Sequence, residues 1–157
     1  MLNISQKSSF LFDCLPSFQN GYLDVANGHK IYYEQYGNPD GKPILFLHGG
    51  PGASFSNHHK AFFDPKIFRV IFYDQRGSGK SVPYAKTEDN NTKSLIADIE
   101  RLRNFLKVDS WYLFGGSWGS TLALLYGIQF PQRCLGFILR GIFLGTIDEI
   151  NWFLYDI

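Results

Sequence analysis

Residues 115–120, GGSWGS, form a glycine-lined corner between two apolar runs. The run before the corner, WYLF, is short and continuous, as strands buried on both faces of a parallel sheet are. The run after it, TLALLYGI, is apolar nearly all round and predicts a buried helix that Pro131 ends. A buried strand that turns directly into a buried helix around a serine is the feature that most constrains the fold.

Short apolar runs of the same kind recur along the chain and alternate with helix-like segments. The strand-like runs cover 43–49, 69–74, 111–116 and 135–141. In residues 92–108 the apolar side chains fall on one helical face, and Thr92 is the candidate N-cap. This alternation predicts an α/β fold, with a mostly parallel sheet and helices on both of its faces.

The beginning of the chain has a different pattern. YLDV at 22–25 and KIYYEQYG at 30–37 flank Asn27-Gly28, a turn sequence that predicts a β-hairpin. No domain boundary is visible, so we expect one domain over 1–157, with its core strands and helices at about 20–145.

The composition excludes several other classes of protein. The chain is 45% hydrophobic and 17% aromatic, which is enough for a packed core. A net charge of +1 without a basic run gives no reason to expect nucleic acid or a membrane surface as a partner. No apolar run approaches the roughly 18 residues of a membrane span, and the N-terminus is a poor signal peptide. Cys14 and Cys134 lack metal-type spacing, so we expect reduced thiols in a cytoplasmic protein and no metal site.

The corner itself matches G-x-S-x-G, the pattern of a nucleophilic serine on a strained strand–helix turn. Such a turn projects the hydroxyl of Ser117 from the carboxyl edge of the sheet, and glycines at 116 and 119 avoid steric clashes. The N–H of Trp118, at the N-terminus of the helix, is a candidate oxyanion donor. The alternative is a glycine-rich turn with an incidental serine, because the pattern is short.

A second glycine-rich loop, HGGPG at 48–52, directly follows a predicted strand. Acyl transfer needs two N–H donors to the oxyanion, and this loop is the expected source of the second. Gly50 is the preferred donor and Gly49 the next. We expect His48 to fix the loop by hydrogen bonding rather than to act as a base, and a tight turn without a ligand is the alternative for the loop.

A third segment, DQRGSGKS at 74–81, is faintly similar to a phosphate-binding loop. The pattern fails because Asp74 occupies the position where such a loop requires glycine. We expect Asp74 and Arg76 to form a pair that organises a loop near the site.

These segments together resemble one family, the prolyl aminopeptidases (proline iminopeptidases) of the α/β-hydrolase fold. The resemblance runs from about Asn20 to the last residue and is carried by HGGPG, FYDQRGSGKS, EDNNTKSLIADIERLR, FGGSWGSTLALLYGIQFPQR and LRGIFL. It implies release of N-terminal proline from a peptide without a metal or organic cofactor. It also implies Ser117 as nucleophile, with Gly50 and Trp118 as oxyanion donors. In the family a helical cap over the proline pocket follows LRGIFL, which would make 146–157 its beginning.

The resemblance fails at the rest of the catalytic triad, which in the family runs Ser, Asp, His along the chain. All four histidines precede Ser117, and the carboxylates that follow it come before the expected triad aspartate; these residues are His29, His48, His58 and His59, and then Asp148, Glu149 and Asp156. The triad Asp and His are therefore expected to lie outside this chain. A serine without a base is a poor nucleophile, so we expect the isolated chain to be inactive.

This gap leads to the expectation of an N-terminal part of a longer enzyme, lacking the cap domain and the last strands. The strand near 135–140 would then be a bare edge. Five apolar residues would form an exposed patch: Ile150, Trp152, Phe153, Leu154 and Tyr155. Two alternatives stay open, namely a non-catalytic remnant or binding module, and an esterase or amidase of the same fold.

Overall fold

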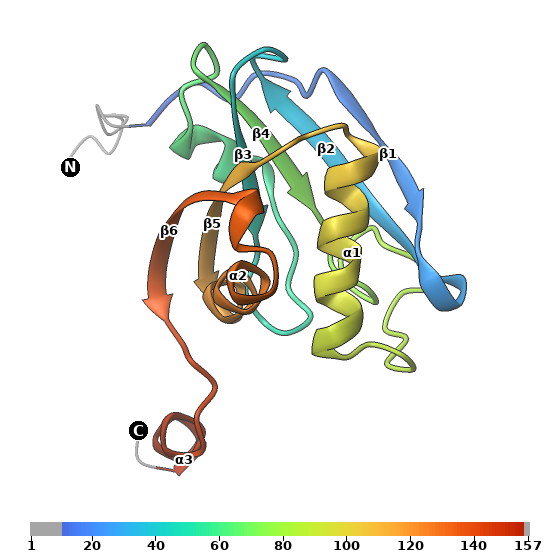
Figure 1. Cartoon of the computed structure of the whole chain (residues 1–157), viewed down its shortest axis with the longest axis vertical. Helices are drawn as coiled ribbons and strands as arrows, with labels where there is room; N and C mark the ends of the chain where they lie inside the picture. The colour runs from blue at the N-terminus through green and yellow to red at the C-terminus, as the bar shows by residue number, and fades with distance from the viewer. Residues whose placement is uncertain (1–10, 156–157) are drawn as a thin grey trace, which may run out of the picture.

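The computed structural model describes residues 11–155 and contains one six-stranded sheet in the order β1-β2-β4-β3-β5-β6 (Figure 1). Neighbours among β3, β4, β5 and β6 pair in parallel, while β1 with β2 and β2 with β4 pair antiparallel. The sheet is therefore mostly parallel, as predicted. The strands are β1 Gln19–Asp24, β2 Lys30–Gly37, β3 Lys42–Leu47, β4 Phe68–Tyr73, β5 Trp111–Ser117 and β6 Cys134–Ile142.

The predicted hairpin joins β1 and β2 through the short 3-10 turn η1, Ala26–Gly28. Asn27 and Gly28 have φ of 64° and 73°, in the left-handed region that these two residue types tolerate best. The sequence Asn-Gly therefore fixes the position of the turn.

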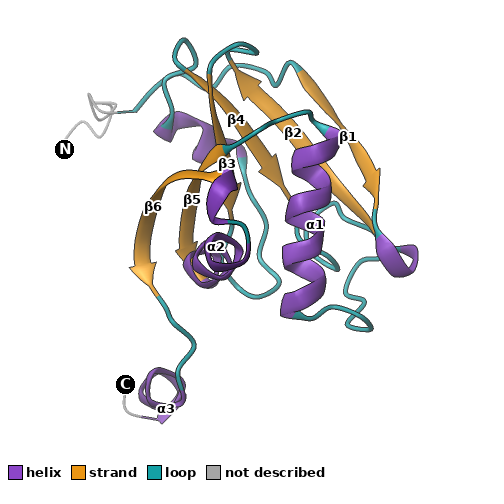
Figure 2. Ribbon diagram, in the orientation of Figure 1, coloured by secondary structure: helices purple, strands orange, loops and turns teal. Residues whose placement is uncertain are grey.

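Two α-helices, α1 (Thr92–Phe105) and α2 (Trp118–Gln129), contact each other on one face of the sheet (Figure 2). Their apolar sides enclose the larger core, where Ile99, Leu122 and Trp111 are inaccessible to solvent. The predicted N-cap of the first helix is wrong by one residue. Asn91, not Thr92, caps α1, because the extended backbone of Asn91 lets its side-chain oxygen accept from the N–H of Ser94 at 3.0 Å.

The other face of the sheet carries a second, aromatic core. Phe46, Phe63 and Phe72 pack there with Phe114, whose ring centroid lies 5.5 Å from that of Phe46. The 3-10 helix η2, Asn57–Phe62, covers this face. Helices thus lie on both faces, but in the described part of the chain both long ones are on the same face.

The β6 side of the molecule is open. Across residues 11–155 no strand pairs with the outer edge of β6, and Leu135 and Ile142 are 50% and 61% exposed. A short 3-10 helix, η3 (Pro131–Arg133), leads into β6, and α3 (Ile147–Tyr155) lies beyond its carboxyl end (Figure 1). The predicted patch is exposed from Trp152 to Tyr155, whereas Ile150 is half-buried. None of the helices within 11–155 has the length and apolarity to cross a membrane.

Candidate active site

Ser117 stands at the junction of β5 and α2 in a strained conformation, with φ 54° and ψ −124°. A non-glycine residue rarely adopts these angles, and surrounding structure must hold it there. Its side chain is exposed, while the flanking residues Gly116 and Gly119 are buried. The sharp turn inferred from G-x-S-x-G is therefore present. It leaves Ser117 exposed to solvent between residues that are buried.

The glycine at 119 is required by backbone packing. A Cβ on Gly119 would collide with the carbonyl oxygen of Leu47 and lie 2.9 Å from that of His48. The first turn of α2 therefore rests directly on the main chain at the end of β3. This contact fixes where the helix begins, and with it the position of Ser117.

The 48–52 loop meets the same corner. A Cβ on Gly49 would lie 3.1 Å from the carbonyl oxygen of Gly116 and 3.9 Å from Oγ of Ser117. Gly50 follows with φ 119°, and its close neighbours are the backbone N atoms of Gly52 and Ala53 in its own loop. Of the two candidate donors of the loop, Gly49 is thus the one that lies beside the serine, whereas the close neighbours of Gly50 belong to its own loop.

His48 is buried and uses both ring nitrogens. Its Nδ1 donates to the carbonyl oxygen of Gly49 at 2.9 Å, while its Nε2 accepts from the backbone N–H of Gln75 at 3.0 Å. Burial lowers the pKa of the imidazole to about 4, so the ring is neutral near pH 7. A histidine whose lone pair already accepts a backbone N–H has none left for a serine proton.

In the described segment, the other three histidines also lie in surroundings that do not include a hydrogen bond to Ser117. Nε2 of His29 lies 3.1 Å from the carbonyl oxygen of Glu88, and Nδ1 of His59 accepts from the N–H of Ser56 at 2.9 Å. His58 is exposed on η2. In the part of the chain that the structure describes, no histidine forms a hydrogen bond with Ser117.

The predicted pairing of Asp74 with Arg76 is wrong, because each residue has other partners. The buried Asp74 carboxylate accepts from the backbone N–H groups of Phe55 at 3.2 Å and Lys80 at 2.7 Å, and burial raises its pKa. Nη2 of Arg76 instead donates to Asp98 of α1 at 2.8 Å, in a pair almost closed to solvent. Asp98 falls on the apolar face of α1, and a carboxylate there requires a buried cation, which is the signal that could have revealed the pair.

Gln75, between those two residues, is a site residue that the sequence reasoning missed. It binds His48 through its backbone N–H and its side-chain amide, and it accepts from the indole N–H of Trp118 at 3.2 Å. A glutamine in a loop carries no motif of its own, so the sequence gives no sign of this role.

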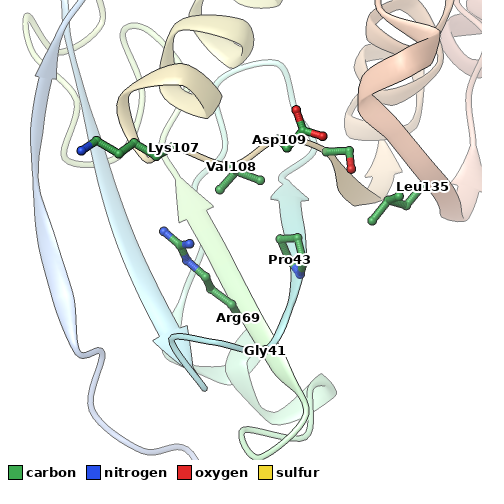
Figure 3. Close-up of a pocket in the computed structure, with 8 residues that line it drawn as sticks. Gly41, Pro43, Arg69, Lys107, Val108, Asp109 and Leu135 are labelled. Atoms are coloured by element: carbon green, nitrogen blue, oxygen red, sulfur yellow. The ribbon is translucent and has the colours of Figure 1, made fainter.

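A pocket of about 200 Å³ lies beside the corner, with Gly49, Gly116, His59 and Arg140 in its lining. A second hollow, of about 300 Å³, lies at the opposite edge of the sheet and includes Pro43 and Arg69, at the amino ends of β3 and β4 (Figure 3). Ligands of open α/β sheets bind at the carboxyl ends of the strands, which makes the first pocket the candidate substrate site. Among residues 11–155, no three His, Cys, Asp or Glu side chains gather closely enough to hold a metal ion.

The chain is similar in sequence to proteins named proline iminopeptidases. A probable proline iminopeptidase of Leptolyngbya boryana is 53% identical over 146 residues, which cover 93% of this chain and 46% of that protein. The proline iminopeptidase of Neisseria gonorrhoeae is 51% identical over 142 residues, covering 90% and 46%. The crystal structure of a proline iminopeptidase-related protein from Thermus thermophilus superposes with a TM-score of 0.67 at 31% identity, covering 77% and 43%.

The chain thus spans about half the length of the curated relatives it matches. A family model described as the alpha/beta hydrolase fold matches residues 42–156, which is most of the chain. Together with the mostly parallel sheet and the strained serine at its carboxyl edge, this match shows that the chain belongs to the α/β-hydrolase fold family.

Proposed function

We propose that this chain supplies the nucleophile and oxyanion half of a serine peptidase that releases N-terminal proline from peptides. The observation that carries the proposal is the strained, exposed Ser117 beside Gly49, in a chain about half identical to proteins named proline iminopeptidases. The cytoplasmic location expected from the sequence is part of the same proposal, since the cytosol keeps free thiols such as Cys14 and Cys134 reduced.

In this mechanism, Oγ of Ser117 attacks the carbonyl carbon of the proline residue, and a base takes the hydroxyl proton. The N–H of Trp118 and that of Gly50 or Gly49 stabilise the oxyanion of the tetrahedral intermediate. The C–N bond then breaks, the base returns the proton to the leaving amine, and a prolyl ester remains on Ser117. Water hydrolyses this ester, which frees proline and restores the hydroxyl.

We expect the base to come from elsewhere than the four histidines of this sequence, since none of them forms a hydrogen bond with Ser117 among the described residues. His48 is neutral and already accepts a backbone N–H, and His59 accepts one as well. About half of the length of the matched relatives lies outside the matched region. We therefore expect the base, its aspartate and the cap to be supplied by a segment equivalent to that half.

A hybrid protein tests the proposal, with this chain followed by the unmatched remainder of the Leptolyngbya boryana protein. The substrate is proline 2-naphthylamide, and the chain alone is assayed beside the hybrid. We expect turnover by the hybrid only, with at least a ~1,000-fold loss in Ser117→Ala and no loss in Ser110→Ala, a control at the opposite edge of the sheet.

Two outcomes would replace the proposal by its alternatives. A folded hybrid that cleaves p-nitrophenyl esters but not the proline substrate would indicate an esterase or amidase. A folded hybrid that cleaves neither would indicate a non-catalytic module, and full activity in Ser117→Ala would exclude the assigned nucleophile.

A further inference from the structure

We propose that Gln75 is a positioning residue that holds the two oxyanion-donating segments at a fixed distance from each other. The inference rests on the proposed function, because it concerns the donors at 49–50 and 118. Gln75 itself does not touch the substrate; it acts through His48 on one side and Trp118 on the other.

The contacts with His48 are made by two different groups of Gln75. The backbone N–H donates to Nε2 of the imidazole at 3.0 Å, and the side-chain amide N–H donates to the carbonyl oxygen of His48 at 2.9 Å. The ring of His48 in turn donates from Nδ1 to the carbonyl oxygen of Gly49. Gln75 thereby fixes both the peptide and the ring at the start of the 48–52 loop.

The contact with the other segment uses the opposite end of the same amide. Oε1 of Gln75 accepts from Nε1 of Trp118 at 3.2 Å, and Trp118 directly follows the proposed nucleophile. The primary amide of Gln75 makes the two contacts at once, because it carries a donor and an acceptor on separate atoms. Glutamate would keep the acceptor and lose the donor, and methionine would lose both.

The backbone position of Gln75 is fixed, because hydrogen bonds hold the residues before and after it in the sequence. Asp74 is held by the N–H groups of Phe55 and Lys80, and Arg76 by the carboxylate of Asp98. Gln75 is itself 3% exposed. An oxyanion donor must stand about 2.7–3.1 Å from the oxygen, and a misplacement of about 1 Å costs on the order of 100-fold in rate. A rigid link between the two segments therefore acts on the transition state more than on substrate binding.

The test compares Gln75→Met and Gln75→Glu with Gln35→Met in the hybrid protein. Gln35 is a matched control, because it is equally buried and hydrogen-bonded but lies on β2 against Gln19 and Arg69. We expect Gln75→Met to lower kcat about 10- to 100-fold with KM within about twofold, and Gln75→Glu to recover part of that loss. Gln35→Met is expected to lower Tm and leave kcat within about twofold.

The indole proton resonance of Trp118 provides a readout that does not depend on turnover. We expect it to move upfield in Gln75→Met, to stay downfield in Gln75→Glu, and to be unchanged in Gln35→Met. An unshifted resonance in Gln75→Met, or equal losses of kcat in Gln75→Met and Gln35→Met, would overturn the positioning role. If the parent hybrid cleaves only esters, the proposed peptidase function fails, while the same kcat comparison on esters still decides the role of Gln75.

Discussion

Strands β4 and β6 have similar apolar sequences and opposite surroundings. Val70, Ile71 and Phe72 of β4 are inaccessible to solvent, whereas Phe137 and Ile138 of β6 are 42% and 46% exposed. Apolar residues in a run therefore predict a strand, but they do not say what covers it. The candidate active site lies between these regions, since β5 pairs with β3 on one side and with β6 on the other.

The same contrast in solvent exposure is found between the two sides of the candidate active site. The side facing β3 and β4 is closed by His48 and Gln75, whose polar groups are satisfied within the protein. On the β6 side, the side chain of Arg140 is exposed at the pocket. The proposed donors at 49–50 thus follow a strand with a complete core, while the pocket is lined both by residues at the end of β3, such as Leu47, and by Arg140 of β6.

Among the changes that test this comparison, Asp98→Ala is expected to have the largest effect on the free energy of unfolding. The change leaves the guanidinium of Arg76 buried without its carboxylate, which typically costs about 3–5 kcal/mol. Urea unfolding measures the loss, with Asp109→Ala as the control, because the Asp109 side chain is 90% exposed in its pair with Arg133. A loss below ~1 kcal/mol for Asp98→Ala would mean that the region around β4 is not closed to water.

A direct comparison of the two strands comes next. Ile71→Ala in β4 removes a fully buried side chain and is expected to cost about 2–5 kcal/mol in the free energy of unfolding. Ile138→Ala in β6 removes a half-exposed side chain and should cost less than ~1 kcal/mol. Denaturant unfolding of both variants provides the measurement, and equal losses would show that β6 is covered as completely as β4.

The third prediction concerns the pH dependence of stability near His48. Because burial lowers its pKa from 6.5 to about 4, folding favours the neutral ring. This contribution is fully present above pH 6.5 and is lost as the pH falls from 6.5 toward 4, up to about 3 kcal/mol. Unfolding curves from about pH 7 to 4 should show a shallower decline in His48→Gln than in the parent. His58→Gln, which changes an exposed ring, should follow the parent curve.

Much of this fold follows from local chemistry in the sequence. The strained turn at Ser117 was predictable, because a buried strand that passes directly into a buried helix must turn sharply, and glycines at 116 and 119 allow the backbone to pack closely there. The hairpin at Asn27-Gly28 was predictable because its positive φ values suit only a few residue types. In both cases the constraint lies within a few residues of the feature.

Features that join distant segments were not predictable in the same way. Asp98 on the apolar face of α1 indicates that a buried cation is needed, but not that this cation is Arg76, 22 residues earlier. Gln75 binds residues from two other motifs. Such contacts depend on which distant segments the fold brings together, and local sequence patterns do not specify this.

The contact of Gly119 with the main chain of Leu47 has a consequence for how specificity can change in this fold. Since the atoms nearest to Gly119 there belong to the backbone, the position of the proposed nucleophile, Oγ of Ser117, does not depend on the side chains that line the pocket. Those side chains can therefore vary in size and charge, and with them the ligands that the pocket admits, while the hydroxyl of Ser117 stays in place.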